Sequence, residues 1–136
     1  MTRLLFVCIG NSCRSPMAEG FARALGDGLV QAESAGLYPA DIIQPETIQV
    51  MAERGIQIGD RGPRLLSDLD GAAYDLLVNM SGLPLASLFR NFSGREIIWD
   101  VPDPIGWPVK VYRSARDHIE KRVASLLEQL EAESRE

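Results

Sequence analysis

Cysteine and histidine are scarce in this chain of 136 residues, which has two cysteines, Cys8 and Cys13, and a single histidine, His118. So few side chains of these types offer no constellation for a metal ion, and two cysteines cannot supply the several disulfides that hold small secreted domains together. We therefore predict that the protein has no metal and no cofactor. We also predict that the two thiols are reactive groups and do not form a structural disulfide.

Excess positive charge and long apolar runs are also lacking. Lysine and arginine number 14 against 19 aspartates and glutamates, which gives a net charge of −5. This balance does not indicate a surface for nucleic acid or for anionic membranes. No apolar run approaches the roughly 20 residues of a membrane span, and the run at 4–8 is too short for the core of a signal peptide. We therefore expect a cytoplasmic protein with neither nucleic acid nor a membrane as its partner.

What the chain does have is a regular alternation of apolar, strand-like runs with helical patterns. Strands are predicted at 3–7, 30–34, 74–79 and 96–99, and helices at 16–25, 45–54 and 84–89. The last segment is the clearest helix, because apolar residues recur at every third or fourth position from Ala115 to Leu130. This pattern predicts one α/β domain over residues 1–136, with an open four-stranded parallel sheet and helices on both faces.

A short loop joins the first predicted strand to the first predicted helix, and its sequence is Cys8-Ile9-Gly10-Asn11-Ser12-Cys13-Arg14-Ser15-Pro16. Ser15 and Pro16 are typical of a helix N-cap and a first helical position. Such a loop directs backbone N–H groups and the positive end of the helix dipole at one spot, which favours an anion of the size of phosphate. The predicted phosphate-binding residues are Ile9, Gly10, Asn11, Ser12, Cys13 and Arg14.

Two side chains of this loop fit chemistry on such an anion. Cys8 stands at the mouth of the site, where a thiol is readily deprotonated to the nucleophilic thiolate. Arg14 can bind two oxygens of a tetrahedral anion at once. Asn11 tolerates the left-handed backbone that a tight loop requires. The plainer alternative is that Cys8 is a small buried residue in a strand-to-helix turn.

These residues resemble the phosphate loop of the low-molecular-weight protein tyrosine phosphatases and of the arsenate reductases that share their fold. The likeness extends over nearly the whole chain and rests on Val7-Cys8-Ile9-Gly10-Asn11, Cys13-Arg14-Ser15-Pro16, Ser34-Ala35-Gly36 and Asp103-Pro104. Ser12 and residues 17–20 look more like the reductase branch. The resemblance implies the fold of that superfamily and a single phosphatase-like catalytic domain.

The same resemblance implies a hydrolase of phosphate monoesters, with phosphotyrosine as the expected substrate, on a phosphorylated protein or as a small aryl phosphate. Cys8 would attack phosphorus and form a phosphocysteine, while Arg14 and the loop hold the oxygens. Ser15 corresponds to the hydroxyl that hydrogen-bonds the nucleophile. Asp103 corresponds to the general acid that protonates the leaving group, and Asp100 is the alternative acid.

Two aromatic residues are candidates for a wall beside an aromatic substrate. The phosphatases commonly follow their Asp-Pro pair with tyrosines, whereas Trp107 stands in that region here, and Tyr38 follows the second predicted strand. Partial burial in ordinary packing is the alternative role for both residues.

Two other functions stay open at this point. An arsenate reductase of the same fold would bind arsenate in the same loop, but Ser81 occupies the position where a relay cysteine is expected. Reduction would therefore need an external small thiol such as glutathione or mycothiol. An oxyanion-binding or redox-sensing module would instead use Cys13 as a redox partner that forms a reversible disulfide with Cys8.

Overall fold

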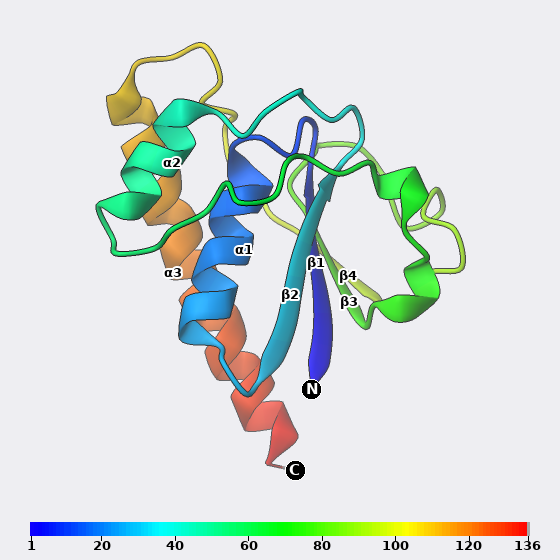
Figure 1. Cartoon of the computed structure of the whole chain (residues 1–136). Coiled ribbons are helices and arrows are strands. Elements are labelled where there is room, and N and C mark those ends of the chain that lie inside the picture. The colour runs from blue at the N-terminus through cyan, green and yellow to red at the C-terminus, as the bar shows by residue number, and fades with distance from the viewer. Residues whose placement is uncertain (136) are drawn as a thin grey trace.

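The computed structural model describes residues 1–135, in which four parallel strands form one sheet (Figure 1). The strands are β1 (Thr2–Cys8), β2 (Val30–Gly36), β3 (Leu76–Asn79) and β4 (Arg95–Ile98), in the order β2-β1-β3-β4. The predicted single α/β domain with a four-stranded parallel sheet is therefore confirmed. β1 lies inside the sheet and is buried on both faces, which is why its sequence is an unbroken apolar run.

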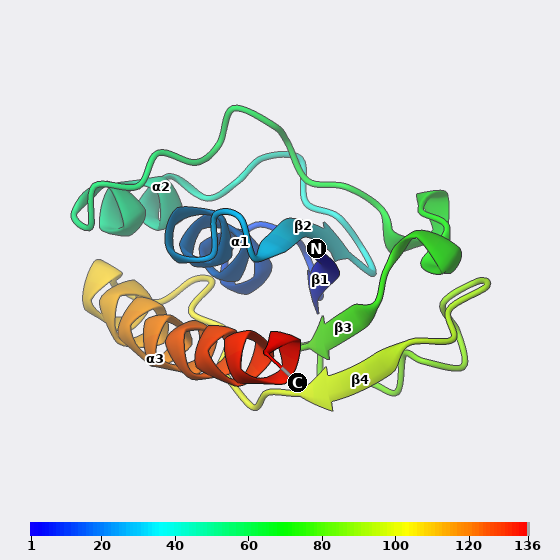
Figure 2. The ribbon, with the colours of Figure 1, turned by 90° about the horizontal axis from the view of Figure 1, so that it is seen from below.

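Both faces of the sheet carry helices, but the two faces differ. The three α-helices, α1 (Arg14–Leu25), α2 (Pro45–Ala52) and α3 (Val109–Ser134), lie together on one face, as Figure 2 shows. The other face is covered by two short 3₁₀ helices, η1 (Leu66–Asp68) and η2 (Gly71–Ala73), and by the turns that precede β4.

Alternate side chains of β1 enter two separate cores. Leu4 and Phe6 belong to the larger core, which includes residues of α1 and α3. Leu5 and Val7 point to the opposite face and pack in the smaller core, which includes Leu66 of η1. All four β1 side chains are fully buried, so the strand is fixed from both sides and its carboxyl end is held firmly in place.

The helix predicted at 84–89 does not form. The backbone N–H groups of Leu88 and Phe89 both donate to the carbonyl of Leu85, at 2.8 and 2.9 Å, and the chain then turns at Asn91, whose φ is 63°. The segment is therefore a single turn. The burial of Leu85 and Phe89, four residues apart, explains why the sequence suggested a helix.

α1 begins at Arg14, two residues earlier than predicted, and Cys13 is its N-cap residue. Ser15 is therefore not the N-cap; it lies inside the first turn, with its hydroxyl facing Cys8. Pro16 is tolerated as the third helical residue because N–H groups of the first turn have no acceptor within the helix. This earlier start brings the backbone of Arg14 and the side chain of Ser15 to the helix N-terminus.

All four strands are parallel, but the direction in which successive strands are added to the sheet reverses at β1. From β2 the chain returns past β1 to form β3 on its far side, and in open sheets of this kind ligands bind at the carboxyl ends of the strands near such a reversal. The loop after β1 and the loop at 99–108 after β4 both lie at this upper edge in Figure 1.

Within residues 1–135, the structure has no helix of the length and apolarity that a membrane crossing requires.

Candidate active site

The loop that follows β1 is curled with its carbonyls facing outward. Asn11, with a φ of 49°, supplies the left-handed turn. The carbonyls of Ile9, Gly10 and Ser12 accept hydrogen bonds of 2.9, 2.9 and 3.0 Å from backbone N–H groups in the segment 38–44. In a planar trans peptide the N–H points away from the preceding carbonyl, so the N–H groups that follow these carbonyls point into the loop.

These backbone donors are not used elsewhere in the part of the chain that the structure describes. No N–H group of residues 9–14 donates to a backbone carbonyl among residues 1–135. Together with the N-terminus of α1, they form a concave array of donors in a field that favours negative charge. This array is suited to the oxygens of a tetrahedral anion.

Arg14 is anchored so that one edge of its guanidinium stays open. Its side chain is only 8% exposed, and Nη1 donates to the carbonyls of Met80 and Val101 at 2.8 and 3.0 Å. The opposite edge carries Nε, which has no hydrogen-bond partner among the described residues, and Nη2, which lies 3.5 Å from Oδ2 of Asp103. A buried, unpaired N–H is costly, so this edge is suited to two oxygens of a bound anion.

Cys8 ends β1 with its thiol almost fully buried. Its Sγ lies 3.0 Å from Oγ of Ser15, which in turn accepts a hydrogen bond of 2.8 Å from Nδ2 of Asn11. The thiol therefore stands beside a hydroxyl that can donate to it, at the base of the donor array. This is the arrangement that a thiolate nucleophile needs.

Asp103 is the acidic residue that the fold brings to the site. Its carboxylate contacts Arg14 through Oδ2, while Oδ1 accepts a hydrogen bond of 3.1 Å from the backbone N–H of Ile105. The side chain is 40% exposed, so it lies at the mouth of the site and not at its base. Asp100 is exposed, and within residues 1–135 its carboxylate makes no ion pair with Arg14.

Cys13 points into the larger core and is 2% exposed. Its Sγ lies 3.7 Å from Oγ of Ser12 and 3.9 Å from the hydroxyl of Tyr112 on α3. Burial raises the pKa of the Cys13 thiol, although neighbouring hydroxyls oppose that effect. The structure has both cysteines as free thiols, with Cys13 facing Tyr112 and Cys8 facing Ser15.

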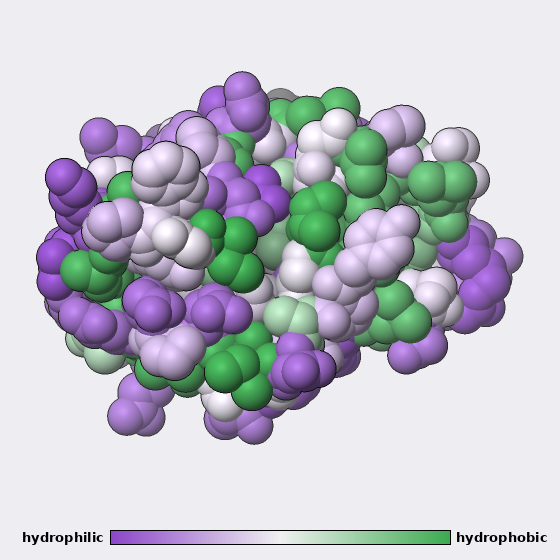
Figure 3. Space-filling model, turned by 90° about the horizontal axis from the view of Figure 1, so that it is seen from above, coloured by the Kyte–Doolittle hydropathy of each residue, from purple (hydrophilic) through white to green (hydrophobic). Residues whose placement is uncertain are grey.

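The two aromatic candidates lie at the rim and are not packed in the core. Tyr38 is 75% exposed and Trp107 is 64% exposed. The backbone of Tyr38 is tied to the carbonyl of Ile9, and that of Trp107 to the carbonyl of Pro104, so each belongs to a loop that borders the site. Seen from above, this side of the molecule has apolar side chains scattered among polar ones (Figure 3).

Sequence reasoning missed four residues that hold the loop in shape. Asn11 donates to Oγ of Ser34 and accepts from the backbone N–H of Arg64, both at 2.9 Å. Ser34 in turn donates to Glu19, and Glu19 also accepts from Arg61. The four missed residues are therefore Ser34, Arg64, Glu19 and Arg61. Glu19 lies four residues after Ser15 on α1, a spacing that places both on one face and was a usable signal. The two arginines, Arg61 and Arg64, lie in a segment without any periodic pattern, so no local sequence pattern indicated them.

Among the described residues, no group of three His, Cys, Asp or Glu side chains gathers as a metal site.

Comparisons with known proteins find likenesses over nearly the whole chain. A family model described as low molecular weight phosphotyrosine protein phosphatase matches residues 3–136. The chain is 34% identical over 129 residues to a glutaredoxin arsenate reductase of Synechocystis sp., with 93% of this chain and 97% of the relative covered. It is 32% identical over 145 residues to a protein-arginine-phosphatase of Geobacillus stearothermophilus, with 96% and 97% covered. The solved structure of an arsenate reductase in the phosphate binding state matches with a TM-score of 0.86 at 32% identity, over 96% of this chain and 99% of that one.

Proposed function

The chain belongs to the low molecular weight phosphotyrosine protein phosphatase family, and from that premise we propose that it hydrolyses phosphate monoesters through a phosphocysteine at Cys8. In this proposal the substrate is phosphotyrosine, on a phosphorylated protein or as a small aryl phosphate. The observation that carries the proposal is a buried thiol at the base of an array of unpaired N–H donors, with a carboxylate at the mouth.

In the first step, the thiolate of Cys8 attacks phosphorus and the bond from phosphorus to the ester oxygen breaks. The loop N–H groups and the open edge of Arg14 hold the equatorial oxygens, where charge is spread in the transition state. Asp103, in its protonated form, gives its proton to the departing oxygen. The products of this step are the free alcohol or phenol and the phosphocysteine.

In the second step, water attacks the phosphorus of the phosphocysteine. The carboxylate of Asp103 takes the proton of that water, and the thiolate of Cys8 leaves. The hydroxyl of Ser15, 3.0 Å from Sγ, stabilises the thiolate both as nucleophile and as leaving group. Inorganic phosphate is released, and the enzyme returns to its starting protonation state.

The exposed rim favours a substrate with an aromatic leaving group on a larger molecule. The rings of Tyr38 and Trp107 are exposed on loops that border the anion site, so they can contact a phenyl ring whose phosphate is bound at Cys8. A side chain presented by a protein surface reaches such a site more easily than it would reach a closed pocket.

A thiol nucleophile works only while it is reduced, and both cysteines are free thiols in the structure. Reducing compartments keep such thiols available. We therefore include a cytoplasmic location in the proposal.

Arsenate reduction is the second candidate function, and the similarity to a glutaredoxin arsenate reductase favours it. Cys8 would attack arsenic of bound arsenate, with loss of water. An external thiol such as glutathione would then attack Sγ of Cys8, so that arsenite leaves with two electrons and a mixed disulfide forms. A second thiol would reduce that disulfide. The external thiol is required in this scheme because Ser81 replaces a relay cysteine and binds Asn79 instead.

One set of assays on the purified protein separates these functions. Phosphate release is measured from p-nitrophenyl phosphate, a phosphotyrosine peptide and a phosphoarginine peptide, and arsenite formation is measured from arsenate with and without glutathione. We expect turnover of the two aryl phosphates and none by Cys8→Ser, which should still bind phosphate. Activity on the phosphoarginine peptide alone would overturn the proposal that phosphotyrosine is the substrate. Thiol-dependent arsenite formation alone would favour the arsenate reductase. Phosphate binding without any turnover would indicate an oxyanion-binding module.

A further inference from the structure

Half of the large apolar side chains that are exposed on this molecule belong to three stretches of loop that border the anion site. Ten such side chains are exposed within residues 1–135, and five of them lie at 37–44, 80–85 and 99–108, directly after β2, β3 and β4. We call these three stretches the rim loops. Their exposed apolar side chains, each between 47% and 75% exposed, are Tyr38, Ile42, Leu83, Ile105 and Trp107. Such a gathering beside a binding site is typical of a contact surface.

The sheet places the rim loops on opposite sides of the anion site. β2 lies on one side of β1, and β3 and β4 lie on the other. The loop after β2 donates to the carbonyls of Ile9, Gly10 and Ser12, whereas the loops after β3 and β4 both accept from Nη1 of Arg14. Figure 3 looks onto this edge of the molecule. A chain segment that passes over the anion site can therefore contact apolar side chains before and after the bound group.

The rim loops also carry negative charge and no positive charge. They contain three aspartates, Asp41, Asp100 and Asp103, but neither lysine nor arginine. Asp103 contacts Arg14, whereas Asp41 and Asp100 are exposed and form no ion pair within residues 1–135. Asp41 follows β2 and Asp100 follows β4, so a carboxylate without a partner stands in the rim loops on each side of the anion site. A ligand whose other groups are positive complements this surface.

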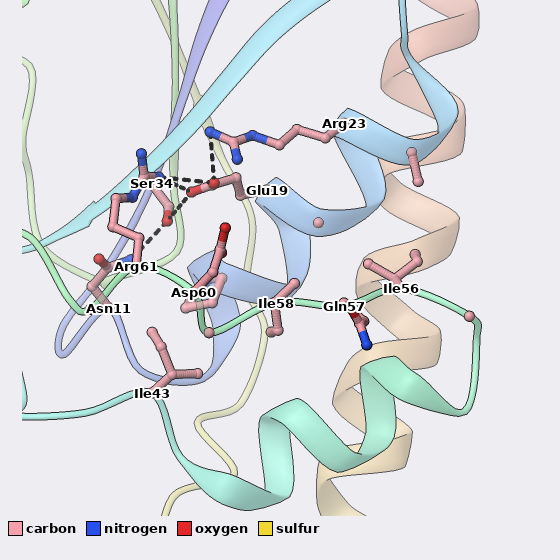
Figure 4. A pocket seen from close by; sticks show the side chains of 16 residues that line it. Asn11, Glu19, Arg23, Ser34, Ile43, Ile56, Gln57, Ile58, Asp60 and Arg61 are labelled. Atoms are coloured by element: carbon pink, nitrogen blue, oxygen red, sulfur yellow. Dashed lines mark hydrogen bonds and ion pairs between the residues drawn. The ribbon is translucent and has the colours of Figure 1, made fainter.

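The cavity behind the loop after β1 offers no comparable complement. It measures about 480 Å³ and lies between α1 and the segment 55–62 (Figure 4). The side chain of Glu19 in its wall is only 12% exposed, and it pairs with Arg61 at 2.9 Å and with Arg23 at 3.0 Å. The charge of Glu19 is thus balanced inside the protein, which leaves the rim loops as the surface that a charged partner fits.

We propose that the rim loops select a protein segment in which basic and apolar residues flank the phosphotyrosine. The flanking basic side chains pair with Asp41 and Asp100, and the flanking apolar side chains cover those of the rim loops. An acidic segment would bring like charges together, and so would a second copy of this chain, which carries the same carboxylates. The proposal rests on the proposed function in that phosphotyrosine is the bound group, but recognition of its neighbours needs no turnover.

Three phosphotyrosine peptides of equal length test this selection. The first has lysines and leucines beside the phosphotyrosine, the second has glutamates in place of the lysines, and the third has serines in place of the leucines. We expect kcat/KM for the first to exceed that for each of the others by roughly tenfold, because several exposed charge pairs or a few covered methylene groups contribute that much. The ratio of the first to the second should fall as sodium chloride is added, because salt screens exposed charges. Equal kcat/KM values for the three peptides would overturn the proposal.

Asp41→Asn and Asp27→Asn form a matched pair for the charge. Both aspartates are exposed, and Asp27 lies in the turn before β2, at the opposite edge of the sheet. Each substitution changes the net charge of the protein equally. We expect Asp41→Asn to reduce the preference for the lysine peptide over the glutamate peptide by roughly two- to fivefold, and Asp27→Asn to leave it unchanged. Equal effects of the two substitutions contradict the proposal, because the preference then follows net charge and not the rim loops.

Ile42→Ser and Leu25→Ser form the corresponding pair for the apolar contact. The two side chains are 57% and 54% exposed, and Leu25 ends α1 at the opposite edge of the sheet. Ile42→Ser should raise KM for the leucine peptide by roughly threefold and leave the serine peptide unaffected, whereas Leu25→Ser should change neither. Hydrolysis of p-nitrophenyl phosphate, which has no flanking residues, should be the same in all four variants. An equal loss by Ile42→Ser on p-nitrophenyl phosphate argues against selection by this side chain.

Failure of the proposed function is distinguishable from failure of this inference. Binding of the three peptides to Cys8→Ser, measured by calorimetry, reports the selection without turnover. If the wild type hydrolyses no aryl phosphate but Cys8→Ser binds the lysine and leucine peptide most tightly, the proposed function fails and the selection stands. Hydrolysis without any preference, or binding of none of the peptides, rules the selection out. A dimer in sedimentation that Ile42→Ser disperses would assign the rim loops to a second copy of the chain and would also rule it out.

Discussion

Arg14 and Asp103 lie 89 residues apart in the sequence, yet Nη2 of the arginine is 3.5 Å from Oδ2 of the aspartate. The arginine follows β1 and the aspartate follows β4, and the two loops meet because the carboxyl ends of parallel strands share one edge of the sheet. The contact places a carboxylate beside the guanidinium of the proposed anion site. It also distinguishes Asp103 from Asp100, whose carboxylate makes no ion pair with Arg14 in the part of the chain that the structure describes.

The first prediction is that Asp103→Asn lowers turnover by roughly 10²–10⁴-fold for a substrate with a poor leaving group, because asparagine cannot donate the proton. The loss should shrink for p-nitrophenyl phosphate, whose leaving group needs little protonation. Steady-state rates on a series of aryl phosphates measure how the loss depends on the leaving group, with Asp100→Asn as the control. If Asp100→Asn shows the leaving-group dependence and Asp103→Asn does not, the acid is Asp100.

The second prediction is that Arg14→Lys nearly abolishes activity although the charge is kept. An ammonium cannot bind two oxygens side by side and also satisfy the carbonyls of Met80 and Val101. Calorimetric titration with phosphate and steady-state kinetics should both show the loss. Arg95→Lys, at an exposed ion pair on β4, is the control and should behave like the wild type. Near-normal activity of Arg14→Lys would show that the guanidinium is only structural.

The third prediction concerns Cys13 as redox partner of Cys8. After mild peroxide, capture of a sulfenic acid at Cys8 by Cys13 should reduce the intact mass by two hydrogens, and dithiothreitol should restore activity. Burial raises the pKa of the Cys13 thiol, so its thiolate is scarce at neutral pH, and the share of disulfide should increase as the pH rises.

Cys13→Ser is the matched variant for that experiment. It should remain active but recover poorly after peroxide, because no thiol intercepts the sulfenic acid. If the wild type instead gains two or three oxygens at every pH, as Cys13→Ser should, Cys13 is a packing residue against Tyr112 and not a redox partner.

The sequence was sufficient for the sheet and for the position of the loop after β1 because both depend on short stretches of chain. The buried run at 4–8, the loop to Arg14 and the alternation of strands with helices are local patterns, and parallel topology then brings the loops after β1 and β4 to one edge. The start of α1 was misplaced because Ser15 and Pro16 satisfy the rules for a helix start. The left-handed turn at Asn11 allows the helix to begin earlier.

The support behind the loop was not predictable from local patterns. Arg61 and Arg64 reach Glu19 and Asn11 across 42 and 53 residues, from a segment whose sequence shows only a loop. Their partners are decided by how that segment lies against α1, which is a property of the folded chain. Similarly, the burial of Leu85 and Phe89 against the sheet produced a helical spacing in a segment that forms only one turn.

The fourth prediction concerns acid stability and the ion pairs between α2 and α3. Glu53, at the end of α2, accepts hydrogen bonds from Arg113 at 2.8 Å and from Arg116 at 2.6 Å. Arg116 is buried and also donates to the carbonyl of Val50. The hydrogen bonds from Arg113 and Arg116 lower the pKa of Glu53 to about 2. Since the ordinary pKa of a glutamate in an unfolded chain is about 4.3, the folded state favours the charged form.

The stabilisation by Glu53 should therefore be complete above the unfolded pKa of about 4.3 and should be lost as the pH falls toward about 2. Glu53→Gln should lower the free energy of unfolding at pH 7, measured by urea titration, and the difference from the wild type should shrink steadily below pH of about 4.3. Glu131→Gln removes an exposed pair with Arg135 at 2.9 Å and should have little effect at any pH. A difference for Glu53→Gln that stays constant from pH 7 down to strongly acidic solution would mean that the charge of the Glu53 carboxylate does not contribute to stability, and that Arg116 is held by Asp117 and the carbonyl of Val50.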